Sequence, residues 1–462
     1  MRNLHQLKSL AVGVALALAT ACEAAPTSEI PKAFNERVHT PQYEERMQWF
    51  RDAKLGIFIH WGIYAVNGIS ESWSLYTGML PYEEYMKQLD GFTAHNYDPK
   101  YWAQLIKGSG AKYAVVTSKH HDGVSLWDSK AHQLTTANKT PAKRDVLTPL
   151  INEFRNHDLK VGLYYSLMDW SHKDFPTRER NVWAYQPKES PQKWQKFLDF
   201  NFQQYRELAE QYNPDLWWFD GQWWLPDMWQ SDKTAKMLRE YNPNVIINSR
   251  LPGQEDYETP EQGVPLASLP NDIPWELCTT MNDSWGYQPT DTNYKTPKDI
   301  IDMFTDTIGL GGNLLLDIGP KPDGTIPAEQ EAILKGLGRW VNKHEKAIFN
   351  TRKGVDYKYF HGPSTIGSAH YQHTDSEDEI LYLFVQHKPN GSIRLKGLES
   401  QIVRAWVVGN GQKVPIRRGT SYKTPGIVYM NVPETALDQD VTVIAIRVAG
   451  KVKMQKEDYH AG

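Results

Sequence analysis

The sequence predicts an α/β fold, a (β/α)8-like barrel followed by a C-terminal antiparallel β-sandwich domain, and two observations support this. Seven short apolar runs, rich in β-branched and aromatic residues, recur before residue 350 with helix-period segments between them. Continuous apolar runs are typical of parallel strands buried on both faces. After residue 350 the chain changes to alternating runs separated by Gly, Pro and Asn, which is typical of an antiparallel β-domain.

The barrel strands are expected, in chain order, at residues 55–60, 113–118, 161–166, 216–220, 245–248, 275–279 and 313–317. Helices are expected to start at Pro191 and Pro297, each after a Ser or Thr, and another helix is expected over residues 333–341. This alternation fits a doubly wound sheet or a barrel. Several strands end in ionisable residues, as at the C-terminal rim of a barrel, so the barrel is favoured although the eighth strand is not found.

Three segments are expected: a signal peptide over residues 1–24, the barrel over residues 25–348 and the β-sandwich over residues 349–462. The N-terminus has basic Arg2 and Lys8, an apolar stretch and then small residues, which indicates export to the periplasm or the extracellular space. Whether the leader is simply cleaved or the chain is lipid-anchored through Cys22 stays open. The C-terminal strands are expected near residues 379–385, 402–408 and 441–448.

The composition excludes several classes of protein. The 51 Lys and Arg residues nearly balance 55 Asp and Glu residues, so a nucleic-acid partner is not expected. Beyond the N-terminus no apolar run is long enough to span a membrane. Only Cys22 and Cys278 occur, which excludes cysteine clusters for zinc or iron–sulfur centres. The 17 Trp and 24 Tyr residues suit stacking on sugar rings or a large aromatic core, and the oligomeric state is not determined by the sequence.

Asp220 is the first candidate for chemistry because it ends the predicted strand at residues 216–220 and precedes Gly221. The two-residue period of a strand places Trp218 and Asp220 on one face, so the carboxylate is expected beside an aromatic wall at the barrel mouth. A carboxylate there can attack an acetal carbon. An N-cap or an ion-paired Asp is the simpler alternative.

Glycoside cleavage needs a second carboxyl group, and two candidates are available. Glu276 lies in the predicted strand at residues 275–279, where burial would raise its pKa and let it donate a proton. Glu261 lies in the loop at residues 256–261, which could reach over the rim. Each of the two could instead be an ion-paired structural acid.

His120 and His121 close another predicted strand and invite a metal-site interpretation. Consecutive strand residues point to opposite faces and no third ligand stands at metal spacing, so a metal site is not expected. The histidines are expected to bind sugar hydroxyls or a carboxylate. With them, further donors and stacking faces at presumed strand ends describe a pocket for a small polyhydroxylated ligand: His60, Tyr164, Arg250 and Trp285.

Several motifs occur in a specific order over residues 49–349: LGIFIHWG at 55–62, TSKHHDG at 117–123, WFDG at 218–221, WE at 275–276 with SWGY at 284–287, and GGNLLL at 311–316. In these motifs the chain closely resembles the retaining α-L-fucosidases of glycoside hydrolase family 29. The resemblance implies a catalytic (β/α)8-like barrel followed by a β-sandwich, and a double displacement without metal or organic cofactor.

By the same resemblance, Asp220 matches the nucleophile and Trp285 matches the aromatic residue beside the C5 methyl group of fucose. Both family positions for the acid/base occur here, Glu261 and Glu276, with a slight preference for Glu276. Residues that match those holding fucose hydroxyls or the nucleophile are His60, His120, His121, Tyr164 and Arg250.

Three positions depart from the family pattern. The run Glu71-Ser72-Trp73 replaces a Glu placed directly before Trp, which makes the assignment of Glu71 and Trp73 to fucose binding less direct. Val124 stands where Phe is usual, and Asp317 replaces an Asn after the Leu run.

The expected function is therefore an exo-acting retaining α-L-fucosidase that acts on fucosylated oligosaccharides or glycans. An α-L-galactosidase of the same family is a related alternative, because that sugar differs only by a hydroxyl group at C6. A non-catalytic carbohydrate-binding protein is the alternative from another class. It would need no pair of carboxyl groups, and the presence of Asp220, Glu261 and Glu276 disfavours it.

Overall fold

The computed structural model describes residues 40–179, 182–223, 225–269, 273–369, 377–421 and 424–456. The expected signal peptide and Cys22 lie outside the described residues. Within those ranges, no helix is both long enough and apolar enough to cross a membrane.

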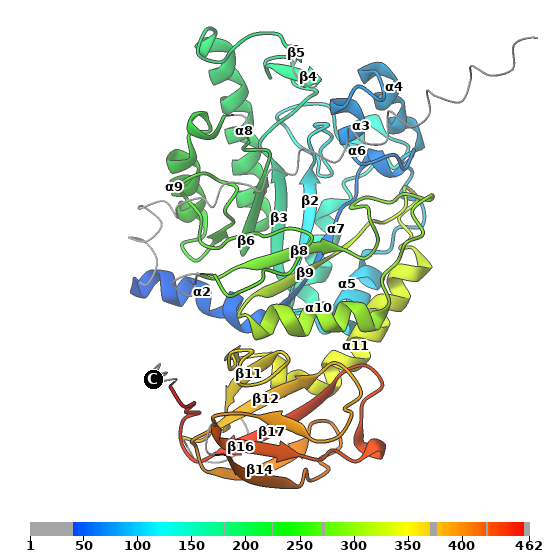
Figure 1. Cartoon of the computed structure of the whole chain (residues 1–462). Coiled ribbons are helices and arrows are strands. Elements are labelled where there is room, and N and C mark those ends of the chain that lie inside the picture. Colours follow the sequence, from blue (N-terminus) through cyan, green and yellow to red (C-terminus); the bar gives the residue numbers. More distant parts are fainter. Residues whose placement is uncertain are drawn as a thin grey trace, which may run out of the picture.

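A curled, seven-stranded parallel sheet forms the centre of the larger domain, in the order β7-β6-β3-β2-β1-β9-β8 (Figure 1). All seven predicted strands are present, which confirms the expected barrel-like sheet. Their bounds are β1 Leu55–Ile59, β2 Tyr113–Lys119, β3 Lys160–Ser166, β6 Leu216–Asp220, β7 Ile246–Ile247, β8 Glu276–Thr280 and β9 Asn313–Ile318.

The place of the missing eighth strand is taken by residues 256–262, which we call the seam segment. It pairs with the chain after β7 through one bridge, Asn248 to Tyr257, and with the start and middle of β8 through two more. One of these two joins Glu261 to Cys278. Because these are single bridges and not a ladder, the segment closes the gap between β7 and β8 without forming a regular strand.

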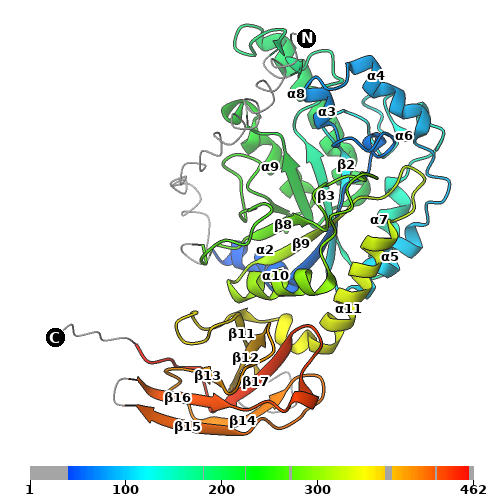
Figure 2. The same cartoon turned by 45° about the vertical axis from the view of Figure 1, so that its right-hand side comes forward.

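Helices cover the outside of the sheet (Figures 1 and 2). The long ones are α2 Pro41–Ala53, α5 Pro99–Gly108, α7 Leu147–Asn156, α8 Pro191–Tyr212, α9 Ser231–Tyr241, α10 Pro297–Gly309 and α11 Ala328–Ile348. The start predicted at Pro297 is confirmed, and Thr296 forms a capping box with Asp299. The start predicted at Pro191 is also confirmed, although Ser190 makes no side-chain cap.

Short helices, 3-10 turns and one hairpin lie in the loops around the barrel. They are α3 Trp73–Tyr76, α4 Tyr82–Met86, α6 Thr136–Lys139, the 3-10 turns Ile63–Ala65, Lys87–Gly91 and Pro226–Met228, and the small hairpin β4 Thr177–Glu179 with β5 Val182–Trp183.

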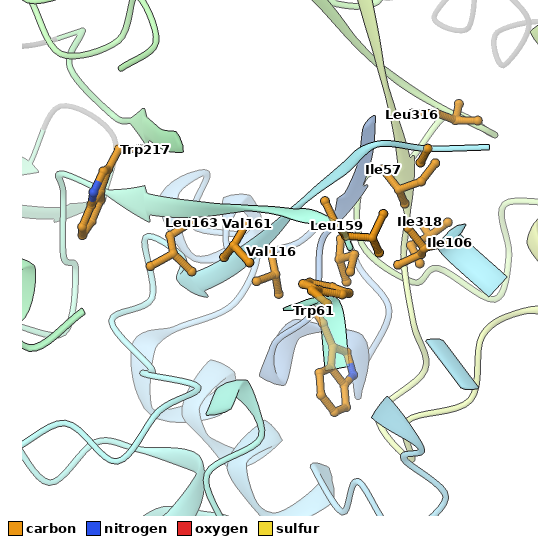
Figure 3. Packing of buried hydrophobic residues seen from close by; sticks show 14 of the residues in the cluster. Ile57, Trp61, Ile106, Val116, Leu159, Val161, Leu163, Trp217, Leu316 and Ile318 are labelled. Atoms are coloured by element: carbon orange, nitrogen blue, oxygen red, sulfur yellow. The ribbon is translucent and has the colours of Figure 1, made fainter. Parts of the chain in front are cut away.

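Neighbouring residues of each barrel strand enter different hydrophobic clusters. Trp217 of β6 packs in the large cluster between sheet and helices, together with Val116 and Leu163 (Figure 3). Trp218, the next residue, packs inside the barrel with Phe58. This alternation follows from the two-residue period of a strand. It turns the inner face of the sheet into an aromatic wall.

The C-terminal domain consists of two antiparallel sheets packed around their own core (Figure 2). The five-stranded sheet contains β10 Arg352–Lys353, β11 Ser364–Ser368, β12 Glu379–Val385, β17 Thr442–Val448 and β14 Ile402–Val407. The three-stranded sheet contains β13 Ile393–Leu395, β16 Thr424–Met430 and β15 Ile416–Ser421, and a 3-10 turn spans Glu434–Ala436. Helix α11 joins the domains, and Nε1 of its Trp340 donates to the carbonyl of Val441 at 2.8 Å.

Candidate active site

A small cavity of about 90 Å³ opens at the carboxyl end of the barrel strands. Ten of its thirteen lining residues were singled out in the sequence, and Phe58, Trp223 and Cys278 were not. The lining residues are Phe58, His60, Glu71, Trp73, His120, Tyr164, Trp218, Asp220, Trp223, Arg250, Glu261, Cys278 and Trp285.

Asp220 is the most strongly positioned acid of the cavity. Its Oδ1 accepts a hydrogen bond from Nη1 of Arg250 at 2.7 Å, and its Oδ2 accepts one from the hydroxyl of Tyr164 at 2.8 Å. Burial on its own would raise the pKa of Asp220, but the charge of Arg250 and these hydrogen bonds outweigh it and hold the pKa below its usual value. Asp220 is therefore a carboxylate at neutral pH, the form that can act as a nucleophile.

Arg250 joins Asp220 to the second acid of the cavity. Its Nη2 donates to Oε2 of Glu261 at 2.7 Å, while its guanidinium lies over the ring of Trp218 at 4.5 Å. The Glu261 side chain keeps 42% of its surface exposed, compared with 10% for Asp220. Glu261 thus lies at the open side of the cavity, where a leaving group would depart.

Glu276 occupies a different environment. Its carboxyl group is fully buried and accepts hydrogen bonds from the hydroxyl of Tyr113 and from Nε1 of Trp218, the latter at 3.0 Å. Burial raises its pKa to about 7, as the sequence suggested for this position. However, Glu276 starts β8, opposite Asn313 at the amino end of β9, and it is not among the cavity-lining residues. This placement favours Glu261 over Glu276 as the acid/base, against the preference taken from the sequence.

His120 and His121 both reach the site, which corrects the expectation that they point to opposite faces. Strand β2 ends at Lys119, so the alternation of a strand does not apply to the next two residues. The two imidazole rings lie 4.3 Å apart. His120 lines the cavity and shares a hydrogen bond of 2.5 Å with Ser72, while Nε2 of His121 lies 3.6 Å from Oδ2 of Asp220. The described residues contain no group of three or more potential metal ligands.

The tautomer of His121 follows from its partner Ser166. The single hydroxyl proton of Ser166 is donated to the carbonyl of Met168 at 2.7 Å, so Ser166 must accept a hydrogen bond from Nδ1 of His121 at 2.6 Å. Burial lowers the pKa of His121 to about 4, which keeps the ring neutral. Nε2 therefore carries a lone pair, and no described residue donates a hydrogen bond to it. A ligand hydroxyl can supply that donor.

Glu71 and Trp73 both line the cavity in spite of the unusual Glu71-Ser72-Trp73 spacing. Ser70 and Glu71 adopt positive φ angles of 80° and 30°, a conformation that non-glycine residues seldom take. The resulting turn lets Oε1 of Glu71 accept a hydrogen bond from the backbone of Gly286 at 2.7 Å. Burial raises the pKa of Glu71 to about 7.

Trp285 and Phe58 contribute apolar surface to the cavity. The ring of Trp285 lies 5.1 Å from the ring of His60 and 6.2 Å from that of Phe58. The strand period could have identified Phe58, because it stands two residues before His60. Trp223 follows Asp220 by three residues in a loop, and its position at the mouth has no comparable sequence signal.

Comparisons with known proteins agree with this geometry. The model of the alpha-L-fucosidase family matches residues 21–346. The tissue alpha-L-fucosidase of Rattus norvegicus is 32% identical over 372 residues, which are 74% of this chain and 78% of the rat protein. The tissue alpha-L-fucosidase of Homo sapiens is 32% identical over 333 residues, which are 66% of this chain and 69% of the human protein.

Solved structures show the same relationship over more of the chain. Alpha-L-fucosidase isoenzyme 1 from Paenibacillus thiaminolyticus superposes with a TM-score of 0.77 at 32% identity, covering 88% of this chain and 99% of the other. A trapped covalent intermediate of a GH29 alpha-L-fucosidase from Bacteroides thetaiotaomicron, in complex with 2-fluoro-fucosyl fluoride, gives a TM-score of 0.76 at 28% identity, covering 87% and 96%. The chain therefore belongs to the alpha-L-fucosidase family, glycoside hydrolase family 29.

Proposed function

We propose that this α-L-fucosidase releases single terminal L-fucose units from fucosylated oligosaccharides or glycans, with Asp220 as the nucleophile and Glu261 as the acid/base. The observation that carries the assignment is the guanidinium of Arg250, which binds both carboxyl groups at 2.7 Å across one small cavity. A cavity of about 90 Å³ has no room for a second sugar unit, so the rest of the glycan would lie outside.

In the first step the ionised Asp220 attacks C1 of the sugar while the protonated Glu261 gives its proton to the departing oxygen. The C1–O bond to the leaving group breaks, and a glycosyl ester forms on Asp220. In the second step Glu261, now ionised, takes a proton from water, which attacks C1 and releases Asp220. Two inversions at C1 give net retention.

Arg250 links the two steps electrostatically. Before reaction its guanidinium binds both carboxyl groups at 2.7 Å. When Asp220 becomes a neutral ester, the full charge of Arg250 faces Glu261.

The remaining cavity residues match the shape of a 6-deoxy sugar. Polar groups for the hydroxyls come from His60, His120 and Tyr164 of the lining and from His121 beside Asp220, and Trp285 with Phe58 offers an apolar surface for the methyl group. An α-L-galactoside would bring a hydroxyl group to this apolar surface. A binding protein without catalytic activity would not need Asp220 and Glu261 held on one cation.

The test is hydrolysis of α-1,2, α-1,3, α-1,4 and α-1,6 fucosides beside an aryl α-L-fucoside, with the anomer of the first product identified by NMR. Release of α-L-fucose as the first product supports the proposal. Failure to hydrolyse any of these compounds would contradict it, and initial release of the β-anomer would contradict the double displacement.

Export of the chain is a separate proposal. Its support is the basic, apolar and small-residue pattern of residues 1–24. Mass spectrometry of the protein from its native envelope should find a mature N-terminus near residues 22–25, and a lipid mass on Cys22 would identify the anchored form. An intact Met1 in the cell-associated protein would contradict export by this signal.

A further inference from the structure

His60 is held from behind by a buried acid that does not line the cavity. Its Nδ1 lies 2.7 Å from Oδ1 of Asp317, and the two side chains are 6% and 1% exposed. Asp317 belongs to β9, paired with Phe58 of β1 on one side and with Thr280 of β8 on the other. Because Nδ1 is occupied, Nε2 is the ring nitrogen of His60 left for a molecule in the cavity.

The contact needs a proton, since a lone pair on Nδ1 and an ionised carboxylate would repel each other at 2.7 Å. The second oxygen of Asp317, Oδ2, is buried without a hydrogen-bond donor among the described residues. An ionised carboxylate with a bare buried oxygen is costly, so the site favours a carboxylic acid that donates to Nδ1. Burial raises the pKa of Asp317 well above its usual range, with a further contribution from Glu71.

His60 itself favours the neutral ring. Burial lowers its pKa to about 3, in spite of the nearby charge of Asp220. Ionisable groups surround the pair from the turn after β1, the loop before α3, the residues after β2, strands β3 and β6, and the loop after β7. They are Tyr64, Glu71, His120, His121, Tyr164, Asp220 and Arg250. The pair therefore holds two protons. One is on Nε2 of His60, and the other lies between Oδ1 of Asp317 and Nδ1 of His60.

We propose that Asp317 is a positioning residue that keeps a proton between its Oδ1 and Nδ1 of His60, and thereby makes Nε2 of His60 a hydrogen-bond donor to an oxygen of the bound sugar. This is the opposite polarity to Nε2 of His121, which carries a lone pair because Ser166 accepts from its Nδ1. His60 would then donate a hydrogen bond to the sugar through its Nε2, and His121 would accept one through its Nε2. The proposal rests on the proposed function, because it places L-fucose in the cavity.

This role gives a reason for Asp317 at a position where the family pattern has Asn. An Asn at position 317 could hold Nδ1 through its amide, as donor or acceptor, but it would carry no titratable proton. With Asp, the pair loses its proton as the pH rises. His60 then moves its remaining ring proton to Nδ1, facing the carboxylate, and Nε2 becomes an acceptor. The donor to the sugar is lost at alkaline pH.

The inhibition constant of L-fucose, measured from pH 5 to 10 on the full chain, tests this consequence. In the unaltered protein the constant should rise about fivefold to tenfold on the alkaline side, the effect of one lost hydrogen bond. Asp317→Asn should bind within a few fold of the unaltered protein at pH 7 and show no such rise. Asp306→Asn is the matched control and should keep the rise, because Asp306 lies on α10 outside the cavity, and burial raises its pKa also.

A second measurement does not depend on the folding of Asp317→Asn. Spectra of 15N-histidine-labelled protein at pH 7, with His60 assigned by the signal lost in His60→Gln, should show the His60 proton on Nε2. A proton on Nδ1 with a bare Nε2, or an unchanged alkaline rise in Asp317→Asn, would overturn the inference while fucose binding itself stands. No binding of L-fucose by the unaltered protein at any pH would overturn the proposed function, and this inference with it.

Discussion

Trp218 forms part of the cavity wall, and its Nε1 donates to the buried carboxyl group of Glu276 at 3.0 Å. Glu276 therefore lies one layer deeper than the cavity, behind an indole ring. Glu276 itself does not line the cavity in which a leaving group would be bound. The relationship separates Glu276 from Glu261, although the sequence slightly preferred Glu276.

The first prediction concerns the acid/base. Proton donation matters for a poor leaving group and little for an activated aryl group. Glu261→Ala should lose far more activity on a natural disaccharide than on an activated aryl fucoside, and azide should restore turnover of the aryl substrate. Glu276→Gln is the matched control and should show neither effect. The opposite pattern, with azide rescue at position 276, would return the role to Glu276.

The second prediction concerns the nucleophile. Asp220→Asn is nearly isosteric. Its single side-chain oxygen can accept from Arg250, and the Tyr164 hydroxyl can rotate to accept from the amide NH2, so the fold should survive. The barrier to glycosyl transfer should rise by more than roughly 4 kcal/mol, a loss of several orders of magnitude in kcat. Steady-state kinetics with an aryl fucoside measures the loss, and an unchanged melting temperature shows that folding is intact. Near-normal turnover would place the nucleophile elsewhere.

The third prediction concerns the acidic limb of the pH profile. Arg250 holds the pKa of Asp220 below its usual value, so the nucleophile stays ionised at low pH. In Arg250→Met burial is no longer offset by that charge, and the pKa of Asp220 should rise. The acidic limb of kcat/KM should therefore move to higher pH, and Arg250→Lys should move it less. An acidic limb at the same pH in all three proteins would show that Asp220 does not control it.

The fourth prediction concerns stability. The folded-state pKa of Glu276, about 7, lies above the ordinary value of 4.5 that the unfolded chain should show. Its contribution to the free energy of unfolding is therefore fully present below pH 4.5 and is lost as the pH rises through about 7, a loss on the order of 3 kcal/mol.

Glu276→Gln removes this titration. Urea unfolding at several pH values should show the variant gaining stability relative to the unaltered protein between pH 4.5 and pH 8. Glu210→Gln replaces an exposed acid on α8 and should show no such pH-dependent gain. Parallel pH dependence of the Glu276→Gln variant and the unaltered protein would mean that Glu276 titrates alike in the folded and unfolded chains.

The fifth prediction concerns the methyl group of the sugar. Trp285 is apolar where C6 should lie, and an added hydroxyl there would lack a partner. The kcat/KM for α-L-fucosides should exceed that for α-L-galactosides by roughly tenfold to a few hundredfold. Trp285→Ala should narrow this ratio. Equal or faster turnover of the galactoside by the unaltered enzyme would favour the alternative substrate.

The seven strands could be predicted because each is a continuous apolar run, but the seam segment could not. Its sequence, DYETPEQ, is polar and contains Pro260, and it is held by single bridges and side chains. Asp256 shows this: its carboxylate binds Arg46 of α2 and Arg239 of α9, partners 210 and 17 residues away. No local sequence pattern indicates contacts between residues that are this far apart in the chain.

The sequence identified most residues that line the cavity, but it did not show how deep each one lies. The strand period correctly indicated that Trp218 and Asp220 face the cavity together. The same period gives Glu276 and Cys278 one face, yet only Cys278 reaches the cavity. The difference is the register, since Glu276 pairs with the first residue of β9 and Thr280 with Asp317 near its end. Register depends on neighbours distant in the sequence, so it could not be read from the strand alone.

Glu261 lies on the seam segment, which single bridges and not a ladder join to its neighbours. A segment joined by single bridges separates from its neighbours at a lower free-energy cost than a strand within a ladder. Glu261 would leave Arg250 in such an opening while the seven strands, and Asp220 with them, stay in place. Thermal inactivation of this enzyme should then be a local event that precedes the loss of its secondary structure, and cross-linking the seam segment to β8 should delay inactivation without raising the global melting temperature by the same amount.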